Sequence, residues 1–210
     1  MADGMKIDLH CHTKYSHDNH LEPEELIEQA LRMGLDGICI TEHFSFEASL
    51  PVEDIPVPEG FFVFRGVEIS TDMGHLLAYG IGDDSWNIWN GNLYLNARDV
   101  MEQIHRRGGI CAPSHPFRGW DSFGAMALEL DGLDAIETHN GGNTMEMNSQ
   151  AMSCARIRNL PSIGGSDCHQ KEHVGRAYTV FSNPVKTIAD LVAEIKKGNC
   201  RGSDIGIHPT

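Results

Sequence analysis

The chain has 210 residues, with 16 lysines and arginines against 30 aspartates and glutamates, so its formal net charge is −14 at pH 7. This acidic balance disfavours non-specific binding to nucleic acid and to anionic membranes. Hydrophobic residues make up 40% and charged residues 22%, which excludes a disordered or fibrous chain, and the length favours a single domain spanning residues 1–210.

Neither a membrane segment nor an export segment is visible. No run approaches the roughly 18 apolar residues of a membrane helix, and the start, Met1-Ala2-Asp3-Gly4, lacks the basic and apolar parts of a signal segment. The six cysteines form no C-x-x-C pair, and most lie in apolar runs, as reduced and buried thiols do. We therefore expect a cytoplasmic protein with no membrane partner.

Strand and helix patterns alternate along the chain. Short apolar runs such as Gly37–Thr41 predict buried strands, whereas Pro23 and Gly34 are typical start and end signals of a helix. Prolines and glycines between Phe44 and Gly60 predict a surface loop. The predicted strands are 7–11, 37–41, 61–69, 75–79, 110–114, 133–138, 161–165 and 178–181, with a short one from Cys200, and the predicted helices are 23–34, 96–108, 121–130, 144–158 and 185–197.

This alternation predicts an α/β fold with a parallel sheet that is covered on both faces. Over 210 residues a closed barrel fits this pattern, and an open doubly wound sheet is the alternative. The sequence has no G-x-G-x-x-G, no Walker loop and no G-x-S-x-G elbow. Dinucleotide, nucleoside triphosphate and serine-hydrolase chemistry therefore lack their signatures.

Twelve histidines are an unusual number, and two of them form an H-x-H motif at the end of the first predicted strand. Because side chains alternate along a strand, His10 and His12 share a face with Asp8, which is placed to orient one ring through its second nitrogen. A D-x-H motif, Asp167 and His169, repeats this arrangement after two glycines that allow a close approach of the backbone. Each motif alone is a weak sign of metal binding.

Further single donors lie where predicted strands begin or end. In a parallel barrel the carboxyl ends of the strands meet at one rim, so these donors would line one cavity. Packing many imidazoles together without a cation is costly, because each ring needs partners and protonated rings repel one another. Nitrogen and oxygen donors without thiolate suit two or three divalent ions such as zinc, manganese or iron. The candidate donors are His10, His12, Asp18, His43, Glu68, His75, His115, Asp167 and His169.

Taken together, these motifs resemble the polymerase and histidinol phosphatase (PHP) family of metal-dependent phosphoesterases. The resemblance spans nearly the whole chain, with Gly66-Val67-Glu68 as an added marker. Its four motifs are Asp8-Leu9-His10-Cys11-His12, Ile40-Thr41-Glu42-His43, Ser114-His115-Pro116 and Gly165-Ser166-Asp167-Cys168-His169. The resemblance implies a distorted seven-stranded (β/α) barrel with a trinuclear metal centre.

The resemblance also implies which residues hold each ion. The implied sets are His10, His12, Glu68 and Asp167 for a first ion, Glu68, His75 and His115 for a second, and Asp18, His43 and His169 for a third. Glu68 would bridge the first two ions. His17 is the alternative to Asp18, because family members vary in the spacing after H-x-H. The short interval between His115 and Glu137, where some nucleotide-processing relatives carry a helical insertion, leaves the substrate open.

The implied chemistry is hydrolysis of phosphate esters. A hydroxide bridging two of the ions would attack phosphorus in line, while the cations neutralise the oxygens of the phosphate. Glu68 and Asp167 are the candidate catalytic residues among the ligands. Arg118 is a candidate bidentate clamp for the phosphate, with a surface ion pair as the alternative. We expect a hydrolase acting on a small-molecule phosphomonoester. The alternatives are a phosphodiesterase or 3′-5′ exonuclease on short nucleic acid, a non-catalytic metal-stabilised binding module, and a hydrolase of C–N bonds.

Other residues are weaker candidates for contact with the substrate. His173 and His139 are candidate acids for the leaving group, and Arg176 is a second candidate clamp. Glu137 either supports the metals from behind or is satisfied in the core. Tryptophan side chains near the rim would offer a stacking platform for a base or a sugar ring. The remaining candidates at the rim are Lys14, Tyr15, His17, His20, Trp86, Trp89 and Trp120, whereas His105 and His208 carry no functional interpretation.

Overall fold

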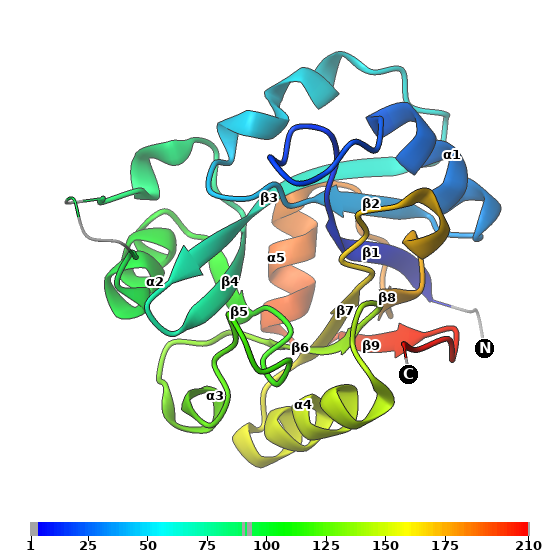
Figure 1. Cartoon of the computed structure of the whole chain (residues 1–210). Helices are drawn as coiled ribbons and strands as arrows, with labels where there is room; N and C mark the ends of the chain where they lie inside the picture. Colours follow the sequence, from blue (N-terminus) through cyan, green and yellow to red (C-terminus); the bar gives the residue numbers. More distant parts are fainter. Residues whose placement is uncertain (1–3, 90, 92–93, 210) are drawn as a thin grey trace.

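The computed structural model describes residues 4–89, 91 and 94–209, and its elements follow one another nearly as the sequence predicts (Figure 1). In chain order they are β1 (Met5–Cys11), α1 (Pro23–Arg32), β2 (Gly37–Ile40), β3 (Phe62–Thr71), β4 (Gly74–Tyr79), α2 (Ala97–Arg106), β5 (Ile110–Pro113), α3 (Met126–Glu129), β6 (Ile136–Asn140), α4 (Met145–Arg158), β7 (Ser162–Gly165), β8 (Ala177–Phe181), α5 (Ile188–Lys196) and β9 (Cys200–Asp204). Short 3₁₀ helices lie at Glu47–Asp54, Asp84–Trp86 and Lys171–His173. Within the described ranges, no helix is both long enough and apolar enough to span a bilayer.

Seven strands form one sheet in the order β5-β4-β3-β2-β1-β8-β9, and β6 and β7 form a separate parallel pair. The central pairs β1–β2 and β2–β3 are parallel, whereas the outer pairs of the large sheet are antiparallel. The prediction of a parallel sheet was therefore wrong for the outer strands. Asp72 and Met73 alone separate β3 from β4, and so short a connection can only turn the chain back on itself.

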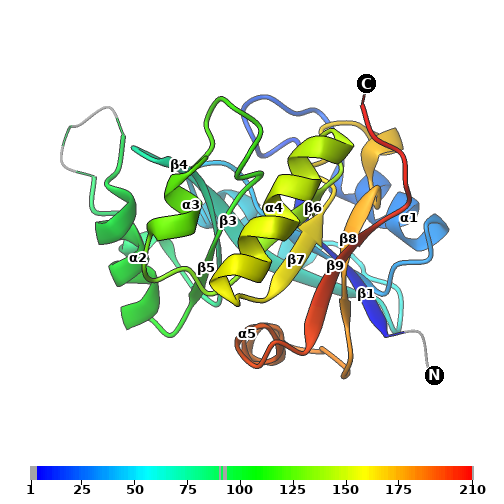
Figure 2. The same ribbon diagram turned by 90° about the horizontal axis from the view of Figure 1, so that it is seen from below.

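The large sheet is curled, and the β6–β7 pair lies between its two ends (Figures 1 and 2). On one side Asp134, just before β6, donates its backbone N–H to the carbonyl of Cys111 in β5 at 2.9 Å. On the other side Gly202 of β9 donates its backbone N–H to the hydroxyl of Ser162 in β7 at 3.0 Å. The result is a mixed α/β fold with a curled half-barrel sheet. The closed seven-stranded (β/α) barrel stays a prediction.

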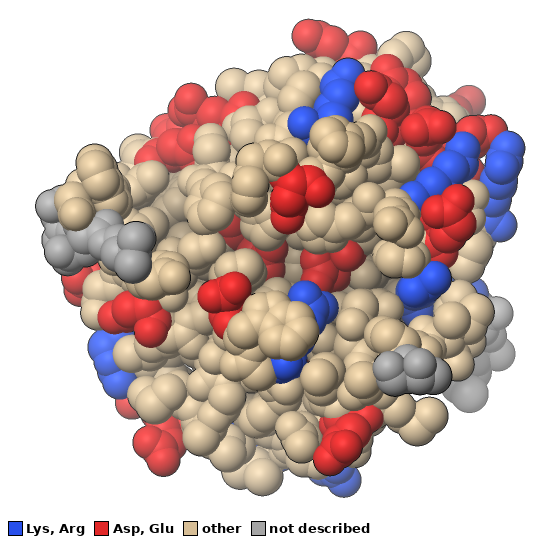
Figure 3. All heavy atoms as spheres, viewed as in Figure 1, with Lys and Arg blue, Asp and Glu red and all other residues tan. Residues whose placement is uncertain are grey.

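Helix α5 closes one end of the curled sheet (Figure 2). Leu191 and Ile195 of α5 are fully buried in one cluster with Leu9 of β1 and Leu77 of β4. Because apolar side chains fill this end, polar groups can gather only at the opposite end, which faces the viewer in Figures 1 and 3. Figure 3 shows that end hollowed near its middle, with acidic side chains inside the hollow.

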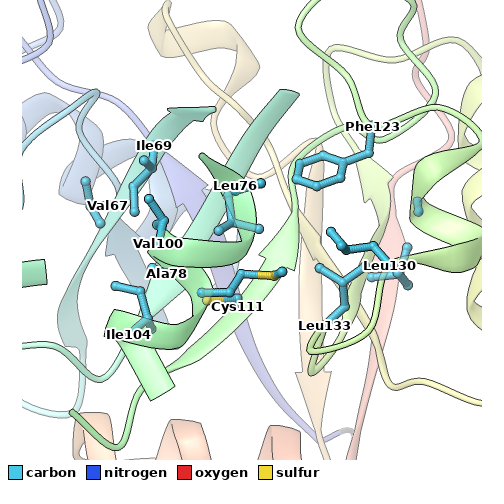
Figure 4. Packing of buried hydrophobic residues seen from close by; sticks show 14 of the residues in the cluster. Val67, Ile69, Leu76, Ala78, Val100, Ile104, Cys111, Phe123, Leu130 and Leu133 are labelled. Carbon is cyan, nitrogen blue, oxygen red and sulfur yellow. The ribbon is translucent and has the colours of Figure 1, made fainter. Parts of the chain in front are cut away.

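A second apolar cluster joins α2, α3 and α4 to the outer face of the sheet (Figure 4). Val100 and Ile104 lie four residues apart on one face of α2 and pack in this cluster with Ile69 of β3 and Leu76 of β4. All four side chains are buried, and burial of one such side chain contributes about 1.5–3 kcal/mol. The helices thereby hold β3 and β4 in place beneath the hollow.

The segment between β2 and β3 differs from the predicted surface loop, because it contains the 3₁₀ helix Glu47–Asp54. Asp84 accepts the backbone N–H of Phe46 at 2.7 Å, and Arg65 donates to the carbonyl of Phe46 at 2.9 Å. These partners lie 38 and 19 residues away in sequence, so local patterns could not indicate them. The structure also shortens the predicted helix at 121–130 to α3 and begins β6 at Ile136 rather than at 133.

Candidate metal centre

Four donor atoms from separate parts of the chain converge at the open end of the sheet. The Nε2 atoms of His10 and His12, at the end of β1, are 3.0 Å apart. Oε2 of Glu68 and Oδ1 of Asp167 each lie 3.3–3.4 Å from both nitrogens. In a tetrahedral zinc site with bonds of about 2.0–2.1 Å, the donor atoms are about 3.3–3.4 Å apart. The four atoms therefore have nearly the spacing of a four-coordinate metal site.

The other oxygen of Glu68 faces a second set of donors. Oε1 lies 3.2 Å from Nδ1 of His75 and 3.2 Å from Nε2 of His115. The antiparallel pairing of β3 with β4 sets Ser70 opposite His75, which brings this histidine next to the carboxylate. The hydroxyl of Ser114 donates to the same oxygen at 2.6 Å. One buried carboxylate thus has histidines against both of its oxygens, an arrangement that allows it to bridge two cations.

A third set of donors is more open to solvent. Oδ2 of Asp18 lies 3.4 Å from Nε2 of His43 and 3.3 Å from Nε2 of His169. The ring of His17 instead lies beside the rings of His43 and Phe44, with centroids 5.6 and 5.5 Å away. The geometry therefore groups Asp18, rather than His17, with these two histidines.

Glu137 supports the donors from behind. Nδ1 of His10 donates to Oε1 of Glu137 at 2.8 Å, and the backbone N–H of His115 donates to Oε2 at 2.6 Å. Glu137 and His10 are fully buried. The carboxylate thereby orients one imidazole and fixes the backbone of the residue that carries another, as carboxylates behind metal-binding histidines do.

The prediction that Asp8 orients one of these rings was wrong. Its carboxylate accepts the backbone N–H groups of His10, Ser166 and Gly175, at 3.2, 2.7 and 3.1 Å. The register between β1 and β2 shifts between Asp8 and Cys11, so the regular alternation of side chains does not hold at this point. Asp8 consequently joins β1 to the segments that follow β7 and precede β8.

The backbone at two candidate ligands adopts the left-handed conformation, with φ of 31° at His115 and 53° at Asp167. Such a conformation costs about 1–3 kcal/mol at a residue other than glycine, and it is typical of functional sites.

The segment that carries Asp167 lies close against β1. The backbone N–H of Asp167 donates to the carbonyl of His10 at 2.7 Å. A Cβ atom added to Gly165 would lie 2.3 Å from the Cβ of His10. The close approach expected from the glycines is confirmed: Gly165 approaches β1, whereas a Cβ added to Gly164 would lie 2.7 Å from the carbonyl oxygen of Tyr178 in β8.

The charges in the cluster stabilise one another. Burial raises the pKa of Glu68 and of Asp167, but the neighbouring histidines outweigh it and hold both pKa values well below the ordinary ones. Burial lowers the pKa of His12, but hydrogen bonds with Asp167 and Glu68 outweigh it and raise this pKa to about 10. The pKa of His10 is also raised, because the charges of Asp167 and Glu68 outweigh burial. A divalent cation can replace the protons that these rings otherwise hold.

A cation fits this set of donors. Nδ1 of His43 is buried and has no hydrogen-bond partner in the described part of the chain. Oε2 of Glu68 lies only 3.1 Å from this nitrogen, but the two atoms do not form a hydrogen bond. A buried polar atom without a partner costs about 1–3 kcal/mol. The nearest thiols, Cys11 and Cys168, are buried in an apolar cluster beside the motifs, in agreement with the prediction of reduced cysteines. The available donors are therefore imidazoles and carboxylates.

Arg118 contacts a candidate ligand. Its Nη2 donates to Oδ2 of Asp167 and to Oδ1 of Asn140, both at 2.7 Å, and its Nε donates to Oδ1 of Asn143 at 3.0 Å. The guanidinium thus holds one oxygen of Asp167, while the other faces the histidines. Neither asparagine was predicted as a site residue. Their only signal was a place within five residues after the predicted strand at 133–138.

Other candidates lie apart from the donors or at their edge. The ring of His139 hydrogen-bonds to the neighbouring threonine and packs against Gly202 of β9, away from the centre. Lys14 pairs with Glu22 at 2.6 Å on the surface. His173 lies in the short 3₁₀ helix after Asp167 and His169, and burial and the charge of Arg176 lower its pKa.

Two family models match the sequence. The model described as PHP domain matches residues 8–110, and the model described as PHP-associated matches residues 146–200. Of the candidate donors, only His115 lies outside these two ranges.

Relatives and solved structures agree with these matches. An uncharacterised protein of Methanocaldococcus jannaschii is 29% identical over 147 residues, which cover 65% of this chain and 82% of that protein. A probable histidinol-phosphatase of Thermotoga maritima is 35% identical over 72 residues, which cover 31% of each chain. A two-domain protein of Bacteroides vulgatus, containing a predicted PHP-like metal-dependent phosphoesterase, has a TM-score of 0.70 at 21% identity, over 95% of this chain and 64% of its own. The chain thus spans less than two thirds of the last two proteins, and the structural likeness shows the fold alone.

Proposed function

Because this chain belongs to the PHP domain family, we propose that it is a metal-dependent phosphoesterase that hydrolyses a small-molecule phosphomonoester. The observation that carries the proposal is the buried carboxylate of Glu68, with histidines against both of its oxygens. The nine candidate donors would hold two or three ions, with zinc, manganese and iron as the expected metals. The curled sheet supports the distorted barrel that the family resemblance implies.

When bound, divalent ions at such a centre act as Lewis acids toward phosphoryl oxygens and lower the pKa of water to about 7. The chain's own part is to hold the ligands rigidly. Glu137 fixes the ring of His10, and Arg118 fixes the carboxylate of Asp167. Because both supports lie in place beforehand, little reorganisation is needed when the substrate arrives.

Arg118 is also suited to bind the phosphate. Nε and Nη2 of its guanidinium contact Asp167, Asn140 and Asn143, whereas Nη1 has no hydrogen-bond partner among the described residues. The side chain is 17% exposed, so the guanidinium is not sealed off from solvent. Charge-assisted hydrogen bonds from arginine to phosphate are about twice as strong as neutral ones. We therefore assign Arg118 two roles, positioning Asp167 and binding the phosphate.

The charge of the chain supports a monoester rather than a nucleic acid as substrate. Proteins that bind single strands follow the backbone with a positively charged groove. This chain instead carries a formal net charge of −14. A single phosphate needs positive charge only at the centre itself, where bound cations and Arg118 would supply it.

The proposal is tested by phosphate release from a panel of monoesters, beside cleavage of an end-labelled diester oligonucleotide, by protein reconstituted with Mn²⁺ or Zn²⁺. We expect monoester turnover and its loss, by at least about a hundredfold, in Asp167→Ala, because this change removes a ligand and the anchor of Arg118. Cleavage of the oligonucleotide alone would instead support a phosphodiesterase. No reaction in either assay, with a rise in Tm on metal addition, would support a binding module.

Replacing Glu137 by glutamine is expected to weaken metal affinity about 10- to 100-fold, because the neutral amide orients His10 less firmly. The measurement is titration of the metal against a chelator of known affinity, together with kcat at saturating metal. Glu102→Gln is the control, since the carboxylate of Glu102 pairs with Arg106 on the exposed face of α2, outside the centre. Equal metal affinities in the two variants would contradict the assigned role of Glu137.

A further inference from the structure

A cavity of about 640 Å³ opens beside the candidate metal centre. Asp18, His43 and His75 belong both to the centre and to the cavity wall. A phosphate bound at the centre would therefore place the organic part of its ester in or beside this cavity. The rest of the wall comes from the end of β3 and from residues on either side of it in sequence, among them Phe44, Trp86, Trp89, Tyr94 and Asp121.

Aromatic rings that would normally be buried are exposed in this wall. The exposed fractions are 51% for Phe44, 67% for Trp89 and 48% for Tyr94. Large aromatic side chains are costly to leave in water, so their grouping around one cavity indicates a binding role. Of the three tryptophans proposed as stacking platforms, Trp86 lines the cavity but is fully buried and Trp120 is not part of the wall, which leaves Trp89 as the exposed one.

The position of Phe44 is fixed by the centre itself. Its backbone has a φ of 68°, a conformation that costs about 1–3 kcal/mol at a residue other than glycine. Its backbone N–H donates to the carbonyl of Glu68 at 2.9 Å, and its ring lies beside those of His17 and His43. The ring is consequently held next to the donors, at the boundary between the centre and the cavity.

The cavity wall carries negative charge and no positive charge apart from histidines. Asp18 and Asp121 line it, and neither lysine nor arginine does so among the described residues. When the centre holds its ions, Asp18 is paired with one of them, so Asp121 is the wall carboxylate that would repel a second anionic group on the substrate. A neutral ring would not be repelled, and a cationic ring would gain attraction both from Asp121 and from the faces of the aromatic rings.

We propose that this cavity binds the organic part of the substrate, and that this part is a flat aromatic or heterocyclic ring without negative charge. The inference rests on the proposed function, because it takes the phosphate to lie at the metal centre. The proposal predicts that compounds with a second phosphate near the ring are poor substrates. Monoesters whose only anionic group is the scissile phosphate should be better substrates.

The test uses phosphonates, which bind without being hydrolysed, and calorimetric titration of the Mn²⁺-loaded protein. Benzylphosphonate is expected to bind about tenfold more tightly than methylphosphonate and more tightly than cyclohexylmethylphosphonate, whose ring is puckered. Adding a carboxylate, in 4-carboxybenzylphosphonate, should weaken binding. Equal affinity for the benzyl and methyl compounds, or tighter binding of the carboxylated one, would overturn the proposal.

Variants of the wall separate ring binding from general damage. Trp89→Ala and Tyr94→Ala are each expected to reduce the preference for benzylphosphonate over methylphosphonate several-fold, and Tyr94→Phe should restore it. Trp120→Ala is the control, because Trp120 is 71% exposed but lies outside the wall, and it should keep the preference. The same loss in Trp120→Ala as in the wall variants would contradict the proposal.

Turnover of benzyl phosphate and methyl phosphate distinguishes the two proposals. If phosphonates bind with the expected preference but neither ester releases phosphate, the proposed function fails and the cavity stands as a site for a ring. If both esters are hydrolysed with the same KM, and the wall variants leave the ratio of the two KM values unchanged, the cavity proposal fails and the phosphoesterase remains.

Discussion

Replacing Glu68 by glutamine is expected to lower phosphate release by at least about a thousandfold, a loss of about 4 kcal/mol of transition-state stabilisation. Glutamine keeps the shape of the side chain but presents an N–H₂ group where one of the two oxygens faces histidines. One of the two donor sets therefore loses its carboxylate oxygen, and the bridge between the sets is broken. The measurements are kcat at saturating metal and the metal content of the purified variant by elemental analysis.

The control for this prediction is Glu102→Gln in α2. Glu102 is exposed and pairs with Arg106 one helical turn away, so its loss should change neither activity nor metal content. Circular dichroism will show whether Glu68→Gln protein is folded. Full activity and full metal content in a folded Glu68→Gln variant would contradict the bridging role of this carboxylate.

In the metal-free protein, the Tm is expected to fall as the pH rises from about 6.5 to about 9, whereas binding of metal should stabilise the protein increasingly over the same range. Burial opposes a proton on His12, but its hydrogen bonds with Asp167 and Glu68 raise the folded-state pKa from 6.5 to about 10. The stability contributed by this proton is fully present below the unfolded pKa and is lost as the pH rises toward the folded one. The loss is at most about 1.4 kcal/mol per pH unit for one ring.

The other titratable groups of the cluster do not reverse the expected fall of Tm with rising pH. The pKa of His10 is raised too, so its proton acts in the same sense. Glu68 and Asp167 have lowered pKa values, so their contribution is present above the unfolded values of 4.5 and 3.8 and is lost only in acid. Metal binding must displace the histidine protons, so it becomes more favourable as the pH rises.

Thermal unfolding followed by circular dichroism, with EDTA or with Mn²⁺, measures both curves. The gap between them should widen with pH, and it should widen equally in Glu102→Gln, whose carboxylate pairs with Arg106 outside the centre. Parallel curves over this range would show that the histidine protons and the metal do not compete.

Strand positions could be predicted because their signals are local. Apolar runs bounded by glycine or proline mark β2 and β7 within a residue of their bounds, since a buried strand needs only its own side chains to be apolar. The direction of the outer strands was not visible in the same pattern. For β3 and β4 it follows from their two-residue connection, which the predicted bounds, 61–69 and 75–79, had made longer.

The candidate ligands were also visible locally, because H-x-H and D-x-H at strand ends place donors within reach of one another. The residues that support these ligands could not be recognised from local patterns. Glu137 lies 127 residues from His10, and Arg118 lies 49 residues from Asp167. Nothing in the residue type of a glutamate or an arginine indicates which distant side chain it will contact.

The order of the motifs along the chain was enough to identify the donor residue types and the family. Three features became visible only in the folded protein: Glu68 faces two sets of histidines, Glu137 rather than Asp8 orients His10, and exposed aromatic rings line a cavity beside the donors. Motifs record only the local geometry of the chain. A shared carboxylate, a buried hydrogen bond and a cavity wall instead arise where distant segments are packed against one another.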